Sequence, residues 1–299
     1  MPCPAITLSS AKVILKGANY DEAYSFAIEY SKENNLSFVH PFADDNVIAG
    51  QGTIYLEIFK EIDDLDAIVV PVGGGGLISG IATVAKVLNP NIKVIGVAAS
   101  GAPAMANSFR AKKPLNTKSV RTIADGIAVK NVSELTLKYI LKYVDDIKLV
   151  CDDEIASAIL FLLERQKLLV EGAGAVGVAA LMHNKLDLPP NSKVCILLSG
   201  GNIDVTMLSL IIEKGLTKTY RKMKLIVTLI DKPGALENFA KLMRKTQANI
   251  VQIGYDRTST DLEFGDAHVS VALETKGKEH QEEIRKILRE NGYSFKEEH

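Results

Sequence analysis

Residues 67–77 read AIVVPVGGGGL, a β-branched apolar run that ends in four consecutive glycines, Gly73, Gly74, Gly75 and Gly76. An apolar segment with helical character follows at residues 77–82. The pattern predicts a buried strand, a tight loop and a helix. Such a loop aims backbone N–H groups at an anion, and the helix N-terminus behind it adds partial positive charge. Because a glycine inside an element costs roughly 1 kcal/mol, four in a row indicate a phosphate close to the backbone. The alternative is a mobile turn between strand and helix.

The spacing of these glycines excludes two common phosphate motifs. The dinucleotide fingerprint requires a third glycine where this chain has Ile78 or Ser79. The P-loop requires a lysine after Gly80, and Ile81 stands there. A single small phosphate ester is therefore the predicted ligand.

The composition bounds the class of protein. The chain has 299 residues, of which 47% are hydrophobic and 24% charged, so it predicts about two domains with a sizeable core. A net charge of -1 gives no reason to expect nucleic acid or an anionic membrane surface as a partner. No apolar run reaches the roughly 18 residues of a membrane span. The N-terminus lacks an export signal, and Cys3, Cys151 and Cys195 are widely spaced, which predicts the reducing cytoplasm.

Strand-like and helix-like segments alternate as far as about residue 220. Predicted strands cover residues 12–15, 67–72, 93–98 and 193–198. Predicted helices cover residues 21–32, 77–88, 152–167 and 172–183, with Asp152 or Asp153 as the N-cap of the third. Alternation of this kind predicts an α/β core, a mainly parallel sheet with helices on both faces. Ligands bind such sheets at the carboxyl ends of strands, where the glycines and residues 199–202 both lie.

The pattern changes beyond a basic linker at residues 218–222. We expect a strand at 224–230, a turn at 231–234, a helix at 235–246, strands at 249–256 and 266–275, a helix at 280–290 and a short strand at 293–295. This βαββαβ order predicts a ferredoxin-like module. The expected domains are residues 1–217 and 222–299.

Five motifs together resemble the threonine dehydratases, or threonine ammonia-lyases, of the fold-type II pyridoxal-phosphate family. They are HPF at 40–42 with GQGT at 50–53, PVGGGGL at 71–77, ADGI at 124–127, VEGAG at 170–174 and LSGGN at 198–202. The resemblance implies a pyridoxal 5'-phosphate enzyme that eliminates the β-hydroxyl of L-threonine, and also of L-serine, giving 2-oxobutanoate and ammonia from threonine. Its role would lie in isoleucine biosynthesis or threonine breakdown. A serine dehydratase or racemase relative is the nearest alternative.

The resemblance also assigns roles to individual residues. The cofactor's phosphate would be held by Val72 and the four glycines. Ser199 would hydrogen-bond the pyridine nitrogen. A hydroxyl in place of a carboxylate keeps that nitrogen largely unprotonated, which favours β-elimination over transamination. Glu171 begins the segment that carries a cation site in relatives. The alternative for Glu171 is a carboxylate hydrogen-bonded at a helix start.

The C-terminal module, with DKPGAL at 231–236, resembles an ACT domain, an amino-acid-sensing module. The resemblance makes Asp231, Pro233 and Gly234 candidate contacts for a regulatory amino acid. The alternative is that they only form a turn and a helix start. The module also implies a homo-oligomer. A rival function is therefore a non-catalytic amino-acid-binding protein that uses this module.

One motif of the family is missing. The Schiff-base lysine lies in a Ser-Phe-Lys-x-Arg-Gly motif that precedes a Met-Pro segment, and this chain starts at Met1-Pro2. The nearest string is SFRAK at 108–112, where Lys112 and the neighbouring Lys113 are interpreted as solvated surface charges. We therefore expect an N-terminally incomplete core, no catalytic residue in these 299 residues, a non-covalent or lost cofactor and no dehydratase activity from the isolated chain.

Overall fold

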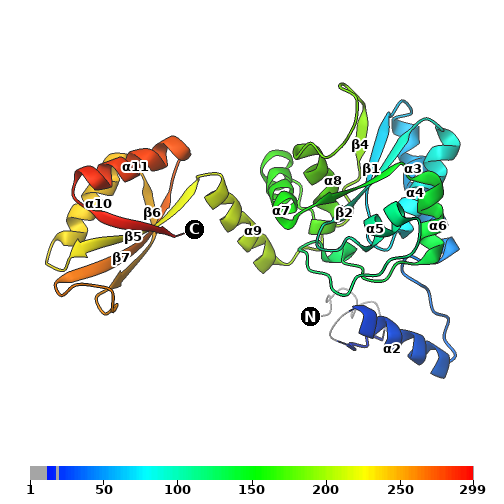
Figure 1. Cartoon of the computed structure of the whole chain (residues 1–299), viewed down its shortest axis with the longest axis horizontal. Coiled ribbons are helices and arrows are strands. Elements are labelled where there is room, and N and C mark those ends of the chain that lie inside the picture. Colours follow the sequence, from blue (N-terminus) through cyan, green and yellow to red (C-terminus); the bar gives the residue numbers. More distant parts are fainter. Residues whose placement is uncertain (1–11, 18–19, 299) are drawn as a thin grey trace.

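The computed structural model describes residues 12–17 and 20–298, and the side chains from residue 22 onward in the second range. The chain forms a core and a C-terminal module, and helix α9 runs from one to the other (Figure 1). The core elements are α2 (Tyr20–Glu33), α3 (Asp45–Glu61), β1 (Ala67–Pro71), α4 (Gly76–Leu88), β2 (Lys93–Ala99), α5 (Ala104–Ala111), η1 (Asp125–Ile127), α6 (Glu134–Tyr143), β3 (Asp146–Val150), α7 (Asp152–Phe161), η2 (Leu162–Gln166), α8 (Gly172–Met182), β4 (Val194–Ile196) and α9 (Val205–Lys218).

The core sheet has four strands in the order β3-β2-β1-β4, and every pairing is parallel. All five residues of β1 are buried. A central parallel strand is covered on both faces, so its sequence is continuously apolar and does not alternate. This explains the uninterrupted run before the glycines.

Helices cover both faces of this sheet. Val69 points into one apolar cluster with Ile155 of α7 and Val176 of α8. Its neighbours Ile68 and Val70 point to the opposite side, into the cluster formed by α3, α4 and α6. The predicted α/β core with helices on both faces is confirmed.

Helices α3 and α4 lie unusually close together. A Cβ added at Gly80 would lie 2.2 Å from the carbonyl oxygen of Ile48, and one added at Gly52 would lie 2.8 Å from Cγ2 of Val84. The two glycines allow this approach. It brings the segment that precedes α3, residues 40–44, against the loop that precedes α4.

Two local predictions were wrong. Residues 12–15 form no strand. Helix α7 begins after Cys151, whose N–H donates to the Glu154 carboxylate at 2.8 Å, so neither Asp152 nor Asp153 is the N-cap. Asp152 instead accepts the Thr122 hydroxyl at 2.6 Å and thereby holds the loop that precedes η1.

The predicted helix over 152–167 also changes character. It is α-helical only to Phe161 and continues as the π-helix η2, whose C-cap Lys167 is in the left-handed region with φ 60°. The wider turn of η2 removes the last residues from the α-helical register. The apolar spacing of the segment contains no signal for this change.

The C-terminal module contains β5 (Lys222–Ile230), α10 (Ala235–Thr246), β6 (Asn249–Asp256), β7 (Asp266–Glu274), α11 (Lys278–Glu290) and β8 (Ser294–Glu298). Its sheet has the order β6-β7-β5-β8 with antiparallel pairing throughout. Phe239 of α10 and Ile284 of α11 pack on Leu225 and Val227 of β5. The βαββαβ order predicted from the sequence is confirmed.

None of the helices in the described residues combines the length and apolar character that a membrane crossing requires.

Candidate active site

A cavity of about 560 Å³ opens at the carboxyl end of β1. Three chain segments far apart in sequence form most of its wall: the glycine loop (residues 73–76), residues 125–129 around η1, and Ser199 after β4. Phe42, Gln51 and Glu171 are among the other residues that line it. The two strand ends that the sequence analysis singled out therefore meet in one cavity.

The glycine loop presents unused N–H groups. The N–H of Val72 donates to Val97 O at 2.8 Å, and the N–H of Ser79 donates to Gly75 O at 3.0 Å. Between them, the N–H groups of residues 73–77 find no acceptor among the residues that the structure describes. These five N–H groups, which we call the phosphate cradle, also stand at the positive end of α4.

Two buried hydroxyls fix the orientation of this loop. Thr136 Oγ1 donates to Gly74 O at 2.8 Å, and Ser79 Oγ donates to Gly75 O at 2.6 Å. In a trans peptide the C=O and the following N–H point in opposite directions. Because both carbonyls are turned into the protein, the N–H groups of Gly75 and Gly76 are turned away from it.

The loop tolerates no side chain. A Cβ at Gly73 would lie 2.7 Å from Cα of Ile127, and a Cβ at Gly74 would lie 2.5 Å from the ring of Phe42. A Cβ at Gly76 would lie 2.6 Å from Phe42 O. Gly75 has φ +90°, the left-handed region that favours glycine. The backbone is thus bare for steric reasons, and a phosphate group fits the donors that it exposes.

Val72, the fifth predicted phosphate contact, does not line the cavity. Its side chain is buried and lies close to Gly96, where an added Cβ would be 2.7 Å from Val72 Cγ2. Its N–H is used by the sheet, as described above. Val72 therefore supports the loop from behind.

Glu171 organises the turn that carries Ser199. Its carboxylate accepts the N–H of Asn202 at 3.0 Å, and its own N–H donates to Gly200 O at 3.3 Å. Gly200 has φ +86°, and a Cβ there would lie 2.5 Å from the carboxylate carbon of Glu171. The turn is packed so closely on Glu171 that only glycine fits.

The cation site at Glu171 stays a prediction, and it would have Glu171 as a single side-chain carboxylate. Among the described residues, no group of three or more His, Cys, Asp or Glu side chains could hold a metal ion. At Gly177, two turns along α8, an added Cβ would lie 2.6 Å from Cγ2 of Ile196. The side of α8 at Gly177 is therefore filled by β4.

The lysines that the sequence analysis considered lie elsewhere. Lys112 is the left-handed C-cap of α5, and both it and Lys113 are exposed, which confirms their interpretation as surface charges. The described residues that line the cavity include no lysine.

Phe42 is the site residue that the sequence analysis missed. Its ring covers Gly74 and its backbone covers Gly76. The HPF motif was noticed only as part of the resemblance. A contact between residues 42 and 74 has no periodicity that a sequence pattern could reveal.

In the C-terminal module, the three predicted regulatory residues lie in the turn between β5 and α10. Asp231 accepts the Tyr255 hydroxyl at 2.9 Å and pairs with Arg257 at 2.5 Å. Gly234 has φ 85° and is the N-cap of α10, and Pro233 precedes it. The carboxylate of Asp231 is therefore already engaged within the module.

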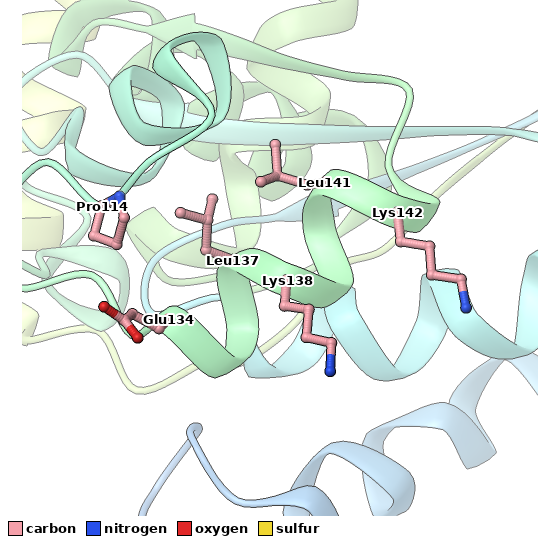
Figure 2. Close-up of a pocket in the computed structure, with 6 residues that line it drawn as sticks. All are labelled: Pro114, Glu134, Leu137, Lys138, Leu141 and Lys142. Atoms are coloured by element: carbon pink, nitrogen blue, oxygen red, sulfur yellow. The ribbon is translucent and has the colours of Figure 1, made fainter.

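A second hollow, of about 410 Å³, lies on the outer side of α6 (Figure 2). Leu137 and Leu141 point to the same side as Pro114, while Lys138 and Lys142 point away from it. The residues that line it include none from the glycine loop or the Ser199 turn. It is separate from the cavity described above.

The chain is similar to known proteins along most of its length. A family model described as "Pyridoxal-phosphate dependent enzyme" matches residues 5–200. An L-threonine ammonia-lyase of Thermotoga maritima is 46% identical over 286 residues, which are 96% of this chain and 71% of that protein. That match extends over the C-terminal module as well as the core.

Solved structures give the same result for the core. The processed form of threonine deaminase isoform 2 from Solanum lycopersicum is 35% identical with a TM-score of 0.64, over 71% of this chain and 60% of that one. Maize serine racemase is 32% identical with a TM-score of 0.64, over 72% of this chain and 66% of that one. The expected fold and cofactor class agree with these relatives. The chain belongs to the pyridoxal-phosphate dependent enzymes and is a homologue of the L-threonine ammonia-lyases.

Proposed function

We propose that this chain forms the phosphate and ring-nitrogen part of a threonine ammonia-lyase active site, which releases ammonia and 2-oxobutanoate from L-threonine. The observation that carries the proposal is the single cavity that joins the phosphate cradle to Ser199. The similarity to the Thermotoga enzyme selects threonine, whereas the similarity to maize serine racemase keeps serine as the second candidate substrate.

Each part of the cavity has a task in this proposal. The phosphate cradle binds the cofactor's phosphate through the N–H groups of residues 73–77. Ser199 donates its hydroxyl hydrogen to an unprotonated ring nitrogen and orients the ring. Phe42 and Ile127 exclude water from the phosphate side. When bound, pyridoxal phosphate supplies the electron sink for elimination.

The proposal includes no covalent bond between this chain and the cofactor. Because the described lining residues include no lysine, we expect the 299-residue chain to bind pyridoxal phosphate reversibly and not to turn threonine over by itself. Borohydride reduction followed by mass spectrometry should find no lysine adduct at the cavity. An adduct there, together with 2-oxobutanoate release from threonine, would contradict this part.

The binding test compares Ser199→Ala with Ser192→Ala. Ser192 is a half-buried serine outside the cavity, and its hydroxyl donates to Pro189 O at 2.8 Å. Equilibrium dialysis with pyridoxal phosphate should show about fivefold weaker binding for Ser199→Ala, because one hydrogen bond contributes about 1 kcal/mol. Ser192→Ala should bind as the original chain does. Equal affinity in all three proteins removes Ser199 from the site, and no binding in any of them refutes the proposal.

The C-terminal module supports the second proposed function, sensing of an amino acid by an ACT-like domain over residues 222–299. The ferredoxin-like sheet favours it. Titration calorimetry with isoleucine, valine and threonine tests it, and absence of heat with all three refutes it.

We also propose that the protein is located in the cytoplasm, where Cys151 and Cys195 remain free thiols, and that it forms a homo-oligomer. Light scattering after size exclusion tests the assembly.

A further inference from the structure

His40 lies next to the site but does not line its cavity. Its Nδ1 accepts two backbone hydrogen bonds, from the N–H of Phe42 at 3.2 Å and from the N–H of Ala43 at 2.8 Å. An imidazole nitrogen that accepts hydrogen bonds carries no proton, so the ring is neutral and its Nε2 holds the hydrogen. The ring thus closes a turn around residues 40–43.

This turn places Phe42 on the glycine loop. The Phe42 ring lies 2.5 Å from the position of a Cβ added at Gly74, and the Phe42 carbonyl oxygen lies 2.6 Å from that of a Cβ added at Gly76. The His40 and Phe42 rings also meet edge to face, with centroids 4.6 Å apart. His40 is therefore connected to the phosphate cradle through a single intervening residue.

Behind Phe42 there is room for the ring to move. A third hollow, of about 350 Å³, is lined by Tyr24, His40, Phe42, Ala43, Val129 and residues 131–133. Phe42 and Val129 line both this hollow and the active-site cavity, so the Phe42 ring forms part of the partition between them. A ring with a hollow on one side and a bare loop on the other needs a fixed backbone to stay in place.

We propose that His40 is a positioning residue, whose Nδ1 holds the backbone of residues 42 and 43 and so keeps Phe42 against the glycine loop as a wall of the phosphate cradle. The inference deepens the proposed function and rests on it for the identity of the bound phosphate. The ordering of the loop itself does not depend on that function.

The same chain shows which replacement keeps the hydrogen bonds. Four residues later, Asp44 Oδ1 accepts the N–H of Asn46 at 2.8 Å and of Val47 at 3.2 Å, two and three residues ahead. An asparagine at position 40 places an oxygen where Nδ1 now lies and can accept both N–H groups in this way. His40→Asn therefore keeps the acceptor, and His40→Ala removes it.

The experiment uses the 299-residue chain with His40→Ala, His40→Asn, Phe42→Ala and the control Phe38→Leu. Phe38 meets the His40 ring with centroids 6.3 Å apart, but it is not among the residues nearest to a Cβ added at any of the four loop glycines. Inorganic phosphate and pyridoxal phosphate are titrated separately by calorimetry. His40→Ala and Phe42→Ala should bind both about five- to tenfold more weakly, and His40→Asn and Phe38→Leu should stay within about twofold.

Hydrogen exchange at residues 72–78, followed by mass spectrometry, provides a readout without ligand. Exchange should be faster in His40→Ala and Phe42→Ala and unchanged in His40→Asn and Phe38→Leu. If the original chain binds neither probe, the proposed function fails and exchange alone decides the role of His40. If His40→Ala exchanges and binds as the original chain does, or if His40→Asn is as impaired as His40→Ala, the inference is wrong.

Discussion

The carboxylate of Glu171 accepts the backbone N–H of Asn202 at 3.0 Å, which ties the start of α8 to the turn after β4. Glu171→Ala removes this acceptor, and we expect the free energy of unfolding to fall by about 1 to 2 kcal/mol. Glu171→Gln keeps an acceptor oxygen, so its free energy of unfolding should fall by less than half of the decrease in Glu171→Ala. Urea unfolding measures both, with the exposed Glu57→Ala as a control. Equal losses from Glu171→Ala and Glu171→Gln would show that the hydrogen bond to Asn202 is not the cause.

The contact between Gly74 and Phe42 predicts a coupling between two mutations. Gly74→Ala places a methyl group 2.5 Å from the Phe42 ring, and we expect a loss of about 2 kcal/mol in unfolding free energy. In a Phe42→Ala background the ring is gone and the same mutation should cost less than about 1 kcal/mol.

Gly76→Ala is the matched control for this cycle. Its methyl group would meet the Phe42 carbonyl oxygen at 2.6 Å, an atom that Phe42→Ala retains. Its cost should therefore stay the same in both backgrounds. Additive effects for Gly74→Ala and Phe42→Ala would contradict the packing described here.

The protonation of His40 predicts a dependence on pH. Burial lowers the pKa of His40 below its ordinary value of 6.5, and the Asp44 carboxylate acts in the opposite direction. The pKa of His40 is lower in the folded chain than in the unfolded chain. At pH values between these two pKa values, the folded chain therefore binds fewer protons than the unfolded chain. The stability that neutral His40 contributes is present above about pH 6.5 and is lost as the pH falls through the folded pKa.

NMR titration of the ring carbons should give a His40 pKa below 6.5, with Tyr24 and Asp44 as the neighbouring titratable groups. The unfolding free energy of His40→Asn should not show this decline. A His40 pKa at or above 6.5 would contradict the acceptor role of Nδ1.

In the C-terminal module, Arg285 of α11 forms an ion pair with Glu297 of β8. Its Nε and Nη2 donate to the two carboxylate oxygens of Glu297 at 2.6 and 2.9 Å, and its side chain is 13% exposed. The pKa of Arg285 is raised, first by its hydrogen bond to Glu297. Arg285→Lys keeps the charge and loses the two-pronged geometry, so the module should lose about 1 kcal/mol of stability. Lys286→Arg on the exposed side of α11 is the control. A loss no larger than that of the control would refute this account.

The sequence predicts the two loops of the site, residues 73–76 and 199–202, better than it predicts the side chains that pack against them. Residues 73–76 and 199–202 each follow an apolar strand, and parallel strands place their carboxyl ends along one edge. That rule places Gly73 and Ser199 at one edge of the sheet, and the pairing of β4 with β1 brings them into one cavity. The ferredoxin-like module follows in the same way from its alternation of strands and helices.

The errors arise where side chains from distant segments compete. Asp152 has the residue type of an N-cap, but Thr122 and the N–H of Ile123 bind its carboxylate, and Cys151 takes the cap position. Residues 12–15 are apolar enough for a strand, yet no sheet edge in the described chain pairs with them. The contact of Phe42 with the glycine loop also depends on the close approach of α3 and α4 at Gly52 and Gly80.

Helix α9 connects the core to the C-terminal module, and only short segments lie at its two ends. It begins at Val205, directly after the turn that Glu171 holds, and ends at Lys218, four residues before β5 starts at Lys222. Fourteen residues at about 1.5 Å each make a rod of about 21 Å. Helix α9 is therefore the connection along the chain between the module and the residues beside Ser199. The core turn at residues 199–202 and the first strand of the module are thus separated by one helix and a few flanking residues.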